Sequence, residues 1–242
     1  MDFALIKDIN LDSEFTWKGK VFLTLDMEWA SDDSIKYVLD KVISNDAKIT
    51  IFCTHETPLI DDLKNESRIE LGIHPNFNFL LNGDFRYGKS IDDVLYYYKQ
   101  IVPDCVSVRS HCLTSGSLFL RALFRHGLQF DCSPIIPASA GMLNRPWLSY
   151  YDNIIQVPIL WEDDIHCMYN WAFHMGPYLN PDRLMVFNFH PVLTVLNIDS
   201  LETYEQSKPV YSDHVALLGR RNQGRGTDDM LEELLREVRS SN

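Results

Sequence analysis

The chain has 242 residues, 45% of them hydrophobic and 23% charged, so we expect residues 1–242 to form one globular domain. Its formal net charge of -12 argues against nucleic acid and anionic lipid as partners, because both carry dense negative charge. No basic segment precedes an apolar run at the N-terminus, and no run of about 18 apolar residues occurs, so we expect no membrane span and a cytoplasmic location. The composition leaves the oligomeric state open.

Short apolar runs bounded by polar turns predict buried parallel strands. In chain order they cover residues 21–27, 48–54, 68–74, 105–111, 128–133, 154–161 and 184–190. Apolar residues spaced three and four apart predict helices at 32–44, 90–102, 116–126 and 227–238. Strands and helices therefore alternate, which is typical of a βα barrel or a doubly wound sheet. The segments 134–153 and 191–226 are predicted to be long loops over a functional face, the second with a short helical pattern near 199–206.

Polar side chains stand where several of these strands end, and in a βα barrel such ends converge on one rim. Asp26 and Glu28 follow the first strand and are two residues apart, so we expect both carboxylates to point to the same face. Two carboxylates that close together shift their pKa values apart or bind a metal. The alternative is a solvated strand end or a helix cap.

His74 ends the third predicted strand and is followed by Pro75, which suits the first turn of a helix. His74 and Asn78 would then share one face of that turn, where an imidazole nitrogen and an amide oxygen can bind a metal together. A histidine that is only hydrogen-bonded is the alternative.

Arg109 and His111 follow the fourth strand, where an arginine needs a carboxylate partner or an anionic substrate. Asp26 is a candidate partner for Arg109. His190 ends the most apolar strand and precedes Pro191, which favours a catalytic role over a buried, hydrogen-bonded histidine. The run 161–164, Trp-Glu-Asp-Asp, reads either as a loop of solvated charge or as part of the site.

These stretches, taken in order, resemble the motifs of the polysaccharide deacetylase superfamily. The family carries a Thr-Phe-Asp-Asp strand, a His-x-x-x-His turn, a strand with arginine, an aspartate-tryptophan loop and a late Leu-x-His. The corresponding stretches here are LTLDMEW, ELGIHPNFN, SVRSH, ILWEDD and FNFHP, and ITIFCTH is similar to the family's second strand. The resemblance runs from about residue 20 to the C-terminus. It implies a single distorted (β/α) barrel of seven or eight strands.

The resemblance also implies roles for the site residues. Asp26 would be the general base, Arg109 would orient it, and His190 would be the general acid. A divalent metal, zinc by default, would be held by His74, by Asn78 and by a carboxylate from Asp26 or Glu28. Two positions depart from the family pattern: Met27 replaces the second aspartate, which passes its role to Glu28, and Asn78 replaces the second histidine.

The implied activity is hydrolysis of a non-peptide carbon–nitrogen bond, with removal of an acetyl group from a sugar. We expect a small N-acylated saccharide or sugar-linked precursor of a surface polysaccharide or lipopolysaccharide as substrate. The substrate-binding candidates are His111, Asp163, Asp164 and the tryptophans Trp29 and Trp161, with Trp147 a further candidate for stacking on a sugar ring. Two alternatives stay open: an allantoinase-like hydrolase without the usual metal, and an inactive barrel that binds a saccharide.

Overall fold

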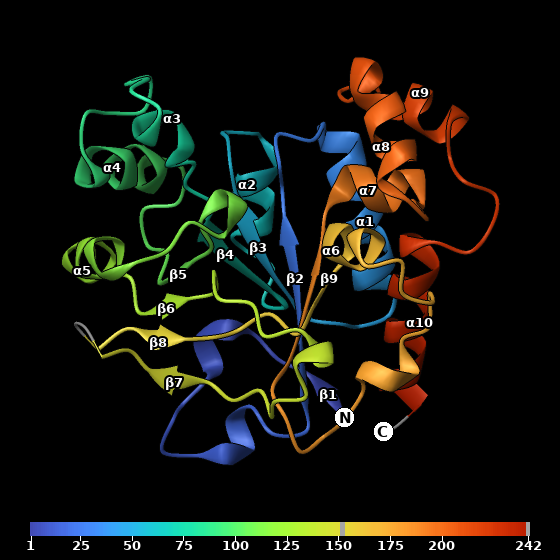
Figure 1. Ribbon diagram of the computed structural model, residues 1–242, viewed down its shortest axis with the longest axis horizontal. Coiled ribbons are helices and arrows are strands. Elements are labelled where there is room, and N and C mark those ends of the chain that lie inside the picture. The colour runs from blue at the N-terminus through green and yellow to red at the C-terminus, as the bar shows by residue number, and fades with distance from the viewer. Residues whose placement is uncertain (151–152, 241–242) are drawn as a thin grey trace.

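The computed structural model describes residues 1–150 and 153–240, and a curled sheet runs through its centre (Figure 1). Its strands follow the order β7-β8-β6-β5-β4-β3-β2-β10-β9, and β1 pairs with β2 outside this path. Neighbouring strands are parallel, except that β7 and β8 are antiparallel. The strands are β1 (Asp2–Phe3), β2 (Lys20–Asp26), β3 (Ile49–Cys53), β4 (Ile69–Ile73), β5 (Ser107–Val108), β6 (Phe130–Asp131), β7 (Trp147–Leu148), β8 (Ile155–Gln156), β9 (Trp161–Glu162) and β10 (Met185–Phe189).

The α/β class predicted from the alternation of strands and helices is confirmed. Within the described residues the strand order ends at β7 and β9, so the sheet is a curled half-barrel, and the predicted count of seven or eight strands is not confirmed. The predicted strand 154–161 is in fact two strands, β8 and β9, which pair with β6 and β10 near opposite ends of the sheet. Pro158 lies between them, and a proline has no N–H for a strand ladder.

Side-chain alternation on the central strands separates an apolar outer face from a partly polar inner one. Leu23 of β2 belongs to the large core beneath the helices, whereas Phe22 belongs to a second apolar cluster inside the curl. Thr24 and Asp26 follow Phe22 at a spacing of two and therefore point to the same inner face. Asn188 of β10 lies opposite Thr24 in the ladder. Polar side chains therefore line the inside of the curl toward the carboxyl ends of β2 and β10.

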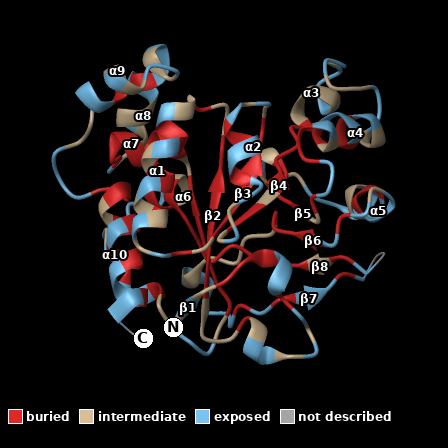
Figure 2. Ribbon diagram, turned by 180° about the vertical axis from the view of Figure 1, so that it is seen from behind, coloured by how far each residue is buried: buried red, intermediate tan, exposed pale blue. Residues whose placement is uncertain are grey.

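Helices flank the sheet and bury their apolar faces toward it, while their outer faces stay exposed (Figure 2). The serine side chains of Ser31 and Ser90 accept hydrogen bonds from the first turns of α1 and α4, which fixes where these helices begin. The helices are α1 (Asp32–Ser44), α2 (Leu59–Leu63), α3 (Asn78–Leu81), α4 (Ile91–Ile101), α5 (Ser117–Arg125), α6 (Asp163–Met168), α7 (Pro191–Leu196), α8 (Leu201–Ser207), α9 (His214–Gly219) and α10 (Thr227–Ser240). No helix in these ranges has the length and apolar character needed to cross a membrane.

The two segments predicted as long loops contain regular structure. Three helices, α7, α8 and α9, lie within 191–226, so that prediction was wrong apart from the short pattern at 199–206, which is α8. Segment 134–153 includes the edge strand β7. Tyr151, one of its aromatic residues, lies outside the described residues.

Candidate active site

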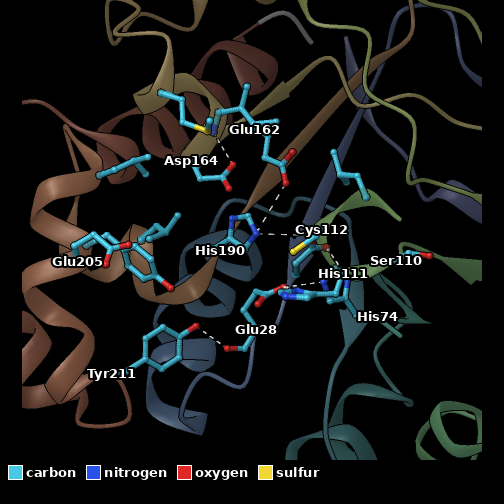
Figure 3. Close-up of a pocket in the computed structure, with 17 residues that line it drawn as sticks. Glu28, His74, Ser110, His111, Cys112, Glu162, Asp164, His190, Glu205 and Tyr211 are labelled. Atoms are coloured by element: carbon cyan, nitrogen blue, oxygen red, sulfur yellow. Dashed lines mark hydrogen bonds and ion pairs between the residues drawn. The ribbon is translucent and has the colours of Figure 1, made fainter. Parts of the chain in front are cut away.

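A cavity of about 580 Å³ opens over the carboxyl ends of β2, β4, β5, β9 and β10 (Figure 3). Residues on α6, α7 and α8 form the opposite wall, so the segment 191–226 contributes helices to the cavity. The lining residues are Asp26, Glu28, His74, Ser110, His111, Cys112, Leu113, Glu162, Asp164, Ile165, Met168, His190, Leu193, Leu201, Tyr204, Glu205 and Tyr211.

Asp26, the last residue of β2, forms a buried ion pair with Arg109. Nη1 of Arg109 donates to Asp26 Oδ1 at 3.0 Å and to Thr24 Oγ1 at 2.8 Å, and Nε donates to the carbonyl oxygen of Cys132 at 3.0 Å. Arg109 is 0% exposed, so its guanidinium acts from behind the cavity wall. Burial raises the pKa of Asp26, but the charge of Arg109, followed by those of His74 and His190, outweighs burial and lowers the pKa overall. Asp26 is therefore ionised near neutral pH and can accept a proton.

Asn188 joins two carboxyl groups at the base of the cavity. Its Nδ2 donates to Asp26 Oδ2 and to Glu162 Oε1, both at 2.9 Å, while its Oδ1 accepts from Thr24 and Arg109. The sequence interpretation gave this residue no role. The signal was present, because Asn188 is a polar residue inside an apolar strand and stands two residues before His190.

His190 follows β10 and faces Asp26 across the cavity. Its Nδ1 donates to Asp163 Oδ1 at 2.6 Å, and its backbone N–H donates to Asp163 Oδ2 at 2.8 Å. Its Nε2 lies 3.8 Å from Asp26 Oδ2. Burial lowers the pKa of His190, but Asp163 first, then Asp164 and Asp26, raise it well above its usual range. His190 therefore holds a proton near neutral pH and can donate it from Nε2.

Glu28, His74 and His111 form a second group beside Asp26. Both His74 Nε2 and His111 Nδ1 lie 2.7 Å from the same oxygen, Glu28 Oε1, and the three side chains offer ligand atoms within 4.8 Å of one another. Burial raises the pKa of Glu28, but hydrogen bonds from His111 and then His74 outweigh burial and hold the pKa well below its usual range. This cluster could hold a metal ion.

The backbone explains how Glu28 reaches this position. Glu28 and Trp29 have positive φ angles of 47° and 54°, so the chain leaves the extended conformation after β2. Glu28 does line the cavity, as predicted. The predicted cause was wrong, because a turn places Glu28 there and not the alternation of side chains along an extended strand. The hydroxyl of Tyr211 donates to the Glu28 carbonyl oxygen at 2.6 Å and the Trp29 N–H donates to Thr54 Oγ1 at 3.0 Å, which hold the turn.

Five of the predicted site residues do not line the cavity: Arg109, Asp163, Asn78, Trp29 and Trp161. Asn78, at the start of α3, accepts a hydrogen bond of 3.4 Å from Thr114 and does not line the cavity, and His111 stands beside Glu28 and His74 instead. Trp161 is 1% exposed and donates from Nε1 to His166 at 2.8 Å, so it packs in the core and cannot stack on a sugar. Trp29 is absent from the lining, with its ring edge-on to His111 at 5.4 Å between centroids.

The acidic run that ends β9 and begins α6 is part of the site and not a solvated loop. Asp163 is 0% exposed and accepts from His190, so it cannot contact a substrate as predicted, whereas Asp164 lines the cavity. Glu162, to which the sequence interpretation gave no separate role, also lines the cavity and is 5% exposed. Burial, and after it the charge of Asp164, raises the pKa of Glu162 to about 8. Trp147 lies on β7 and does not line the cavity.

A family model and a solved structure of similar sequence point to the same family. The family described as WbmS-like polysaccharide deacetylases matches residues 23–208. A Bordetella bronchiseptica protein, provisionally described as a polysaccharide deacetylase involved in O-antigen biosynthesis, superposes with a TM-score of 0.93 at 36% identity over 98% of each chain. The peptidoglycan N-acetylglucosamine deacetylase Bc1960 superposes with a TM-score of 0.51 at 13% identity, over 93% of this chain and 83% of its own, which shows a shared fold. No curated protein matches the sequence.

Proposed function

Because this chain belongs to the WbmS-like polysaccharide deacetylase family and is therefore a hydrolase of the N-acetyl bonds of sugars, we propose that it deacetylates a precursor of a surface polysaccharide or lipopolysaccharide. The observation that carries this proposal is the pair of Asp26 and His190. They face each other at 3.8 Å in one cavity, with their pKa values shifted in opposite directions. An ionised base and a protonated acid at that separation are what amide hydrolysis requires at neutral pH.

A divalent cation, zinc by default, fits the cluster of Glu28, His74 and His111. Two imidazoles and a carboxylate are a donor set that zinc prefers at catalytic sites, and both imidazole nitrogens already converge on one carboxylate oxygen. The other ring nitrogen of His74 has no hydrogen-bond partner among the described residues and lies 3.7 Å from Asp26 Oδ1. A carboxylate behind a ligating histidine is a common supporting arrangement. When bound, the cation would act as a Lewis acid toward the amide carbonyl.

The chain's own residues account for the proton transfers. Asp26 takes a proton from the water whose oxygen attacks the carbonyl carbon. Arg109 and Asn188 each hold one of its carboxylate oxygens, so the base stays ionised and oriented. His190 then donates its Nε2 proton to the nitrogen as the carbon–nitrogen bond breaks, which leaves acetate and an amine. Asp163 keeps that proton on the imidazole beforehand.

Acetate release and metal content test the proposal. The protein should release acetate from at least one member of a panel of short N-acetylated saccharides, nucleotide-linked sugars and chitin-like polymers. It should also purify with about one zinc per chain by elemental analysis, and His111→Ala should lose that metal while the control Asn78→Ala keeps it.

Metal content unchanged in His111→Ala would reject the proposed ligand set. A metal-free protein that hydrolyses a carbon–nitrogen bond in the presence of chelator would favour the allantoinase-like alternative. A folded protein that binds these saccharides and releases nothing from any of them would favour the inactive barrel.

A further inference from the structure

Among the residues that line the cavity, the proposed chemistry leaves one buried acidic group unused. Glu162 ends β9, is 5% exposed and lines the same cavity as Asp26 and His190. Its Oε1 accepts one hydrogen bond, from Asn188, and its Oε2 has no hydrogen-bond partner within residues 1–150 and 153–240. A buried carboxyl group with so few partners costs stability. Asn188 Nδ2 donates one hydrogen to Asp26 and the other to Glu162 Oε1, so holding Asn188 takes up only one acceptor position of Glu162.

The position of Glu162 relative to His190 suggests what it binds. Glu162 Oε1 lies 4.0 Å from His190 Nε2, the atom that must give its proton to the leaving nitrogen. Asp26, Glu162 and His190 offer polar atoms that all lie within 4.8 Å of one another. Figure 3 shows the carboxyl group of Glu162 directed toward the His190 ring from the side opposite Glu28 and His74. A nitrogen at hydrogen-bond distance from Nε2 would thus lie within reach of Glu162.

The two carboxyl groups near that nitrogen differ in how many hydrogen bonds they already accept. Asp26 Oδ1 is paired with Arg109 and Asp26 Oδ2 with Asn188, and Asp26 must also hold the attacking water. Glu162 Oε1 accepts one hydrogen bond, so an oxygen lone pair remains for another donor. A proton on Oε2 would leave Oε1 as a carbonyl acceptor, so the group can accept an N–H in either protonation state.

We propose that Glu162 positions the substrate by accepting the N–H of the scissile amide, which turns the nitrogen toward His190. This assignment rests on the proposed deacetylase function and makes Glu162 a determinant of selectivity for amides over esters. An acetyl ester has no hydrogen on its bridging oxygen. It therefore cannot donate to Glu162 and gains nothing from that side chain.

A matched pair of probes tests this: methyl 2-acetamido-2-deoxyglucoside and methyl 2-O-acetylglucoside, which differ at the scissile bond. Glu162→Leu removes the acceptor and keeps the side chain's approximate size, and Glu162→Gln restores an acceptor oxygen. We expect Glu162→Leu to lower kcat/KM for the amide by about 10- to 100-fold and for the ester by less than about 3-fold. Glu162→Gln should recover most of the amide activity. Glu205→Gln, a carboxyl group at the exposed side of the same cavity, is the control and should leave the amide-to-ester ratio unchanged.

Equal losses on amide and ester would overturn the assignment, because a purely structural role through Asn188 and Asp26 would affect both substrates alike. Hydrolysis of neither probe by the wild-type protein would count against the proposed function. In that case the role of Glu162 is still decided by titrating the protein with each glycoside and measuring binding by ligand-observed NMR. The wild-type protein should bind the amide glycoside more tightly than the ester, and Glu162→Leu should abolish that preference. Absence of the preference in the wild-type protein would overturn the inference.

Discussion

Replacing Asp163 with asparagine should change how both activity and stability depend on pH. Asp163 is 0% exposed and accepts three hydrogen bonds: from His190 Nδ1 at 2.6 Å, from the His190 backbone N–H at 2.8 Å and from the Asp164 backbone N–H at 2.9 Å. Asparagine offers one acceptor oxygen in place of two. The variant must therefore lose at least one of its bonds to His190, together with the negative charge that faces the imidazolium.

The size of the effect follows from the surroundings of His190. Asp164 and Asp26 still face the ring in the variant, so its charge is not left without partners, and the expected cost is about 1.5–3 kcal/mol, as for one hydrogen bond to a charged group. The wild-type pKa of His190 is raised above its usual 6.5, so its contribution to stability is fully present below about pH 6.5 and is lost as the pH rises through the raised pKa. Asp163→Asn lowers that pKa and removes most of this contribution.

Urea unfolding and a pH–rate profile measure the two consequences. The difference in unfolding free energy between wild type and Asp163→Asn should be largest at about pH 5.5 and should shrink as the pH rises through the raised pKa of His190. The alkaline limb of kcat should move to lower pH in the variant, because the general acid loses its proton earlier. A stability difference that does not change with pH, together with an unmoved alkaline limb, would refute the role assigned to Asp163.

Two further predictions concern the charges of the site. Arg109→Met leaves Asp26 buried without its main cation, and should destabilise the protein by about 3–5 kcal/mol at neutral pH in urea unfolding; a cost below about 1 kcal/mol would contradict the ion pair. Five of the residues that line the cavity are acidic. No lysine or arginine of the described part of the chain lines it. Acetate should therefore be released faster from a neutral N-acetylated saccharide than from a nucleotide-linked sugar, with a gap that narrows as salt is added; preference for the nucleotide-linked sugar would contradict this.

The long strands could be predicted from sequence because their apolar runs are continuous. Strands β2, β3, β4 and β10 lie within about a residue of the predicted runs, as expected when both faces of a parallel sheet are covered. The runs predicted at 105–111 and 128–133 contain only two paired residues each. An apolar run reports burial, whereas strand length depends on where the neighbouring strand ends. Of the helices within 191–226, only α8 was anticipated. Helices α7 and α9 have six residues each, which is too short for a helical spacing of apolar residues to show in the sequence.

The residues at the carboxyl ends of strands were the more predictable part of the site. Asp26, His74 and His190 line one cavity, as expected when parallel strands end at one rim. The position of Trp161 was predicted wrongly because neighbouring side chains on a strand point to opposite faces: Glu162 points into the cavity and Trp161 into the core. The sequence does not show that the predicted strand 154–161 is two strands, so it could not tell which of its residues face the cavity. The Asn188 contacts need the register of β2 against β10, which no local pattern contains.

Whether Asn78 or His111 completes the proposed metal site depends on which strands are neighbours in the sheet, and this cannot be read from the sequence. A motif read along the chain places the second histidine four residues after His74, on the turn that follows β4. In the structure β4 and β5 are adjacent, with Ile73 opposite Val108, so the turns after both strands open onto the same space. A nitrogen ligand absent from the first turn can therefore be supplied by the second, and His111, three residues beyond Val108, lies 2.7 Å from Glu28. What the proposed site requires is the convergence of three donors, and adjacent parallel strands allow that convergence from either turn.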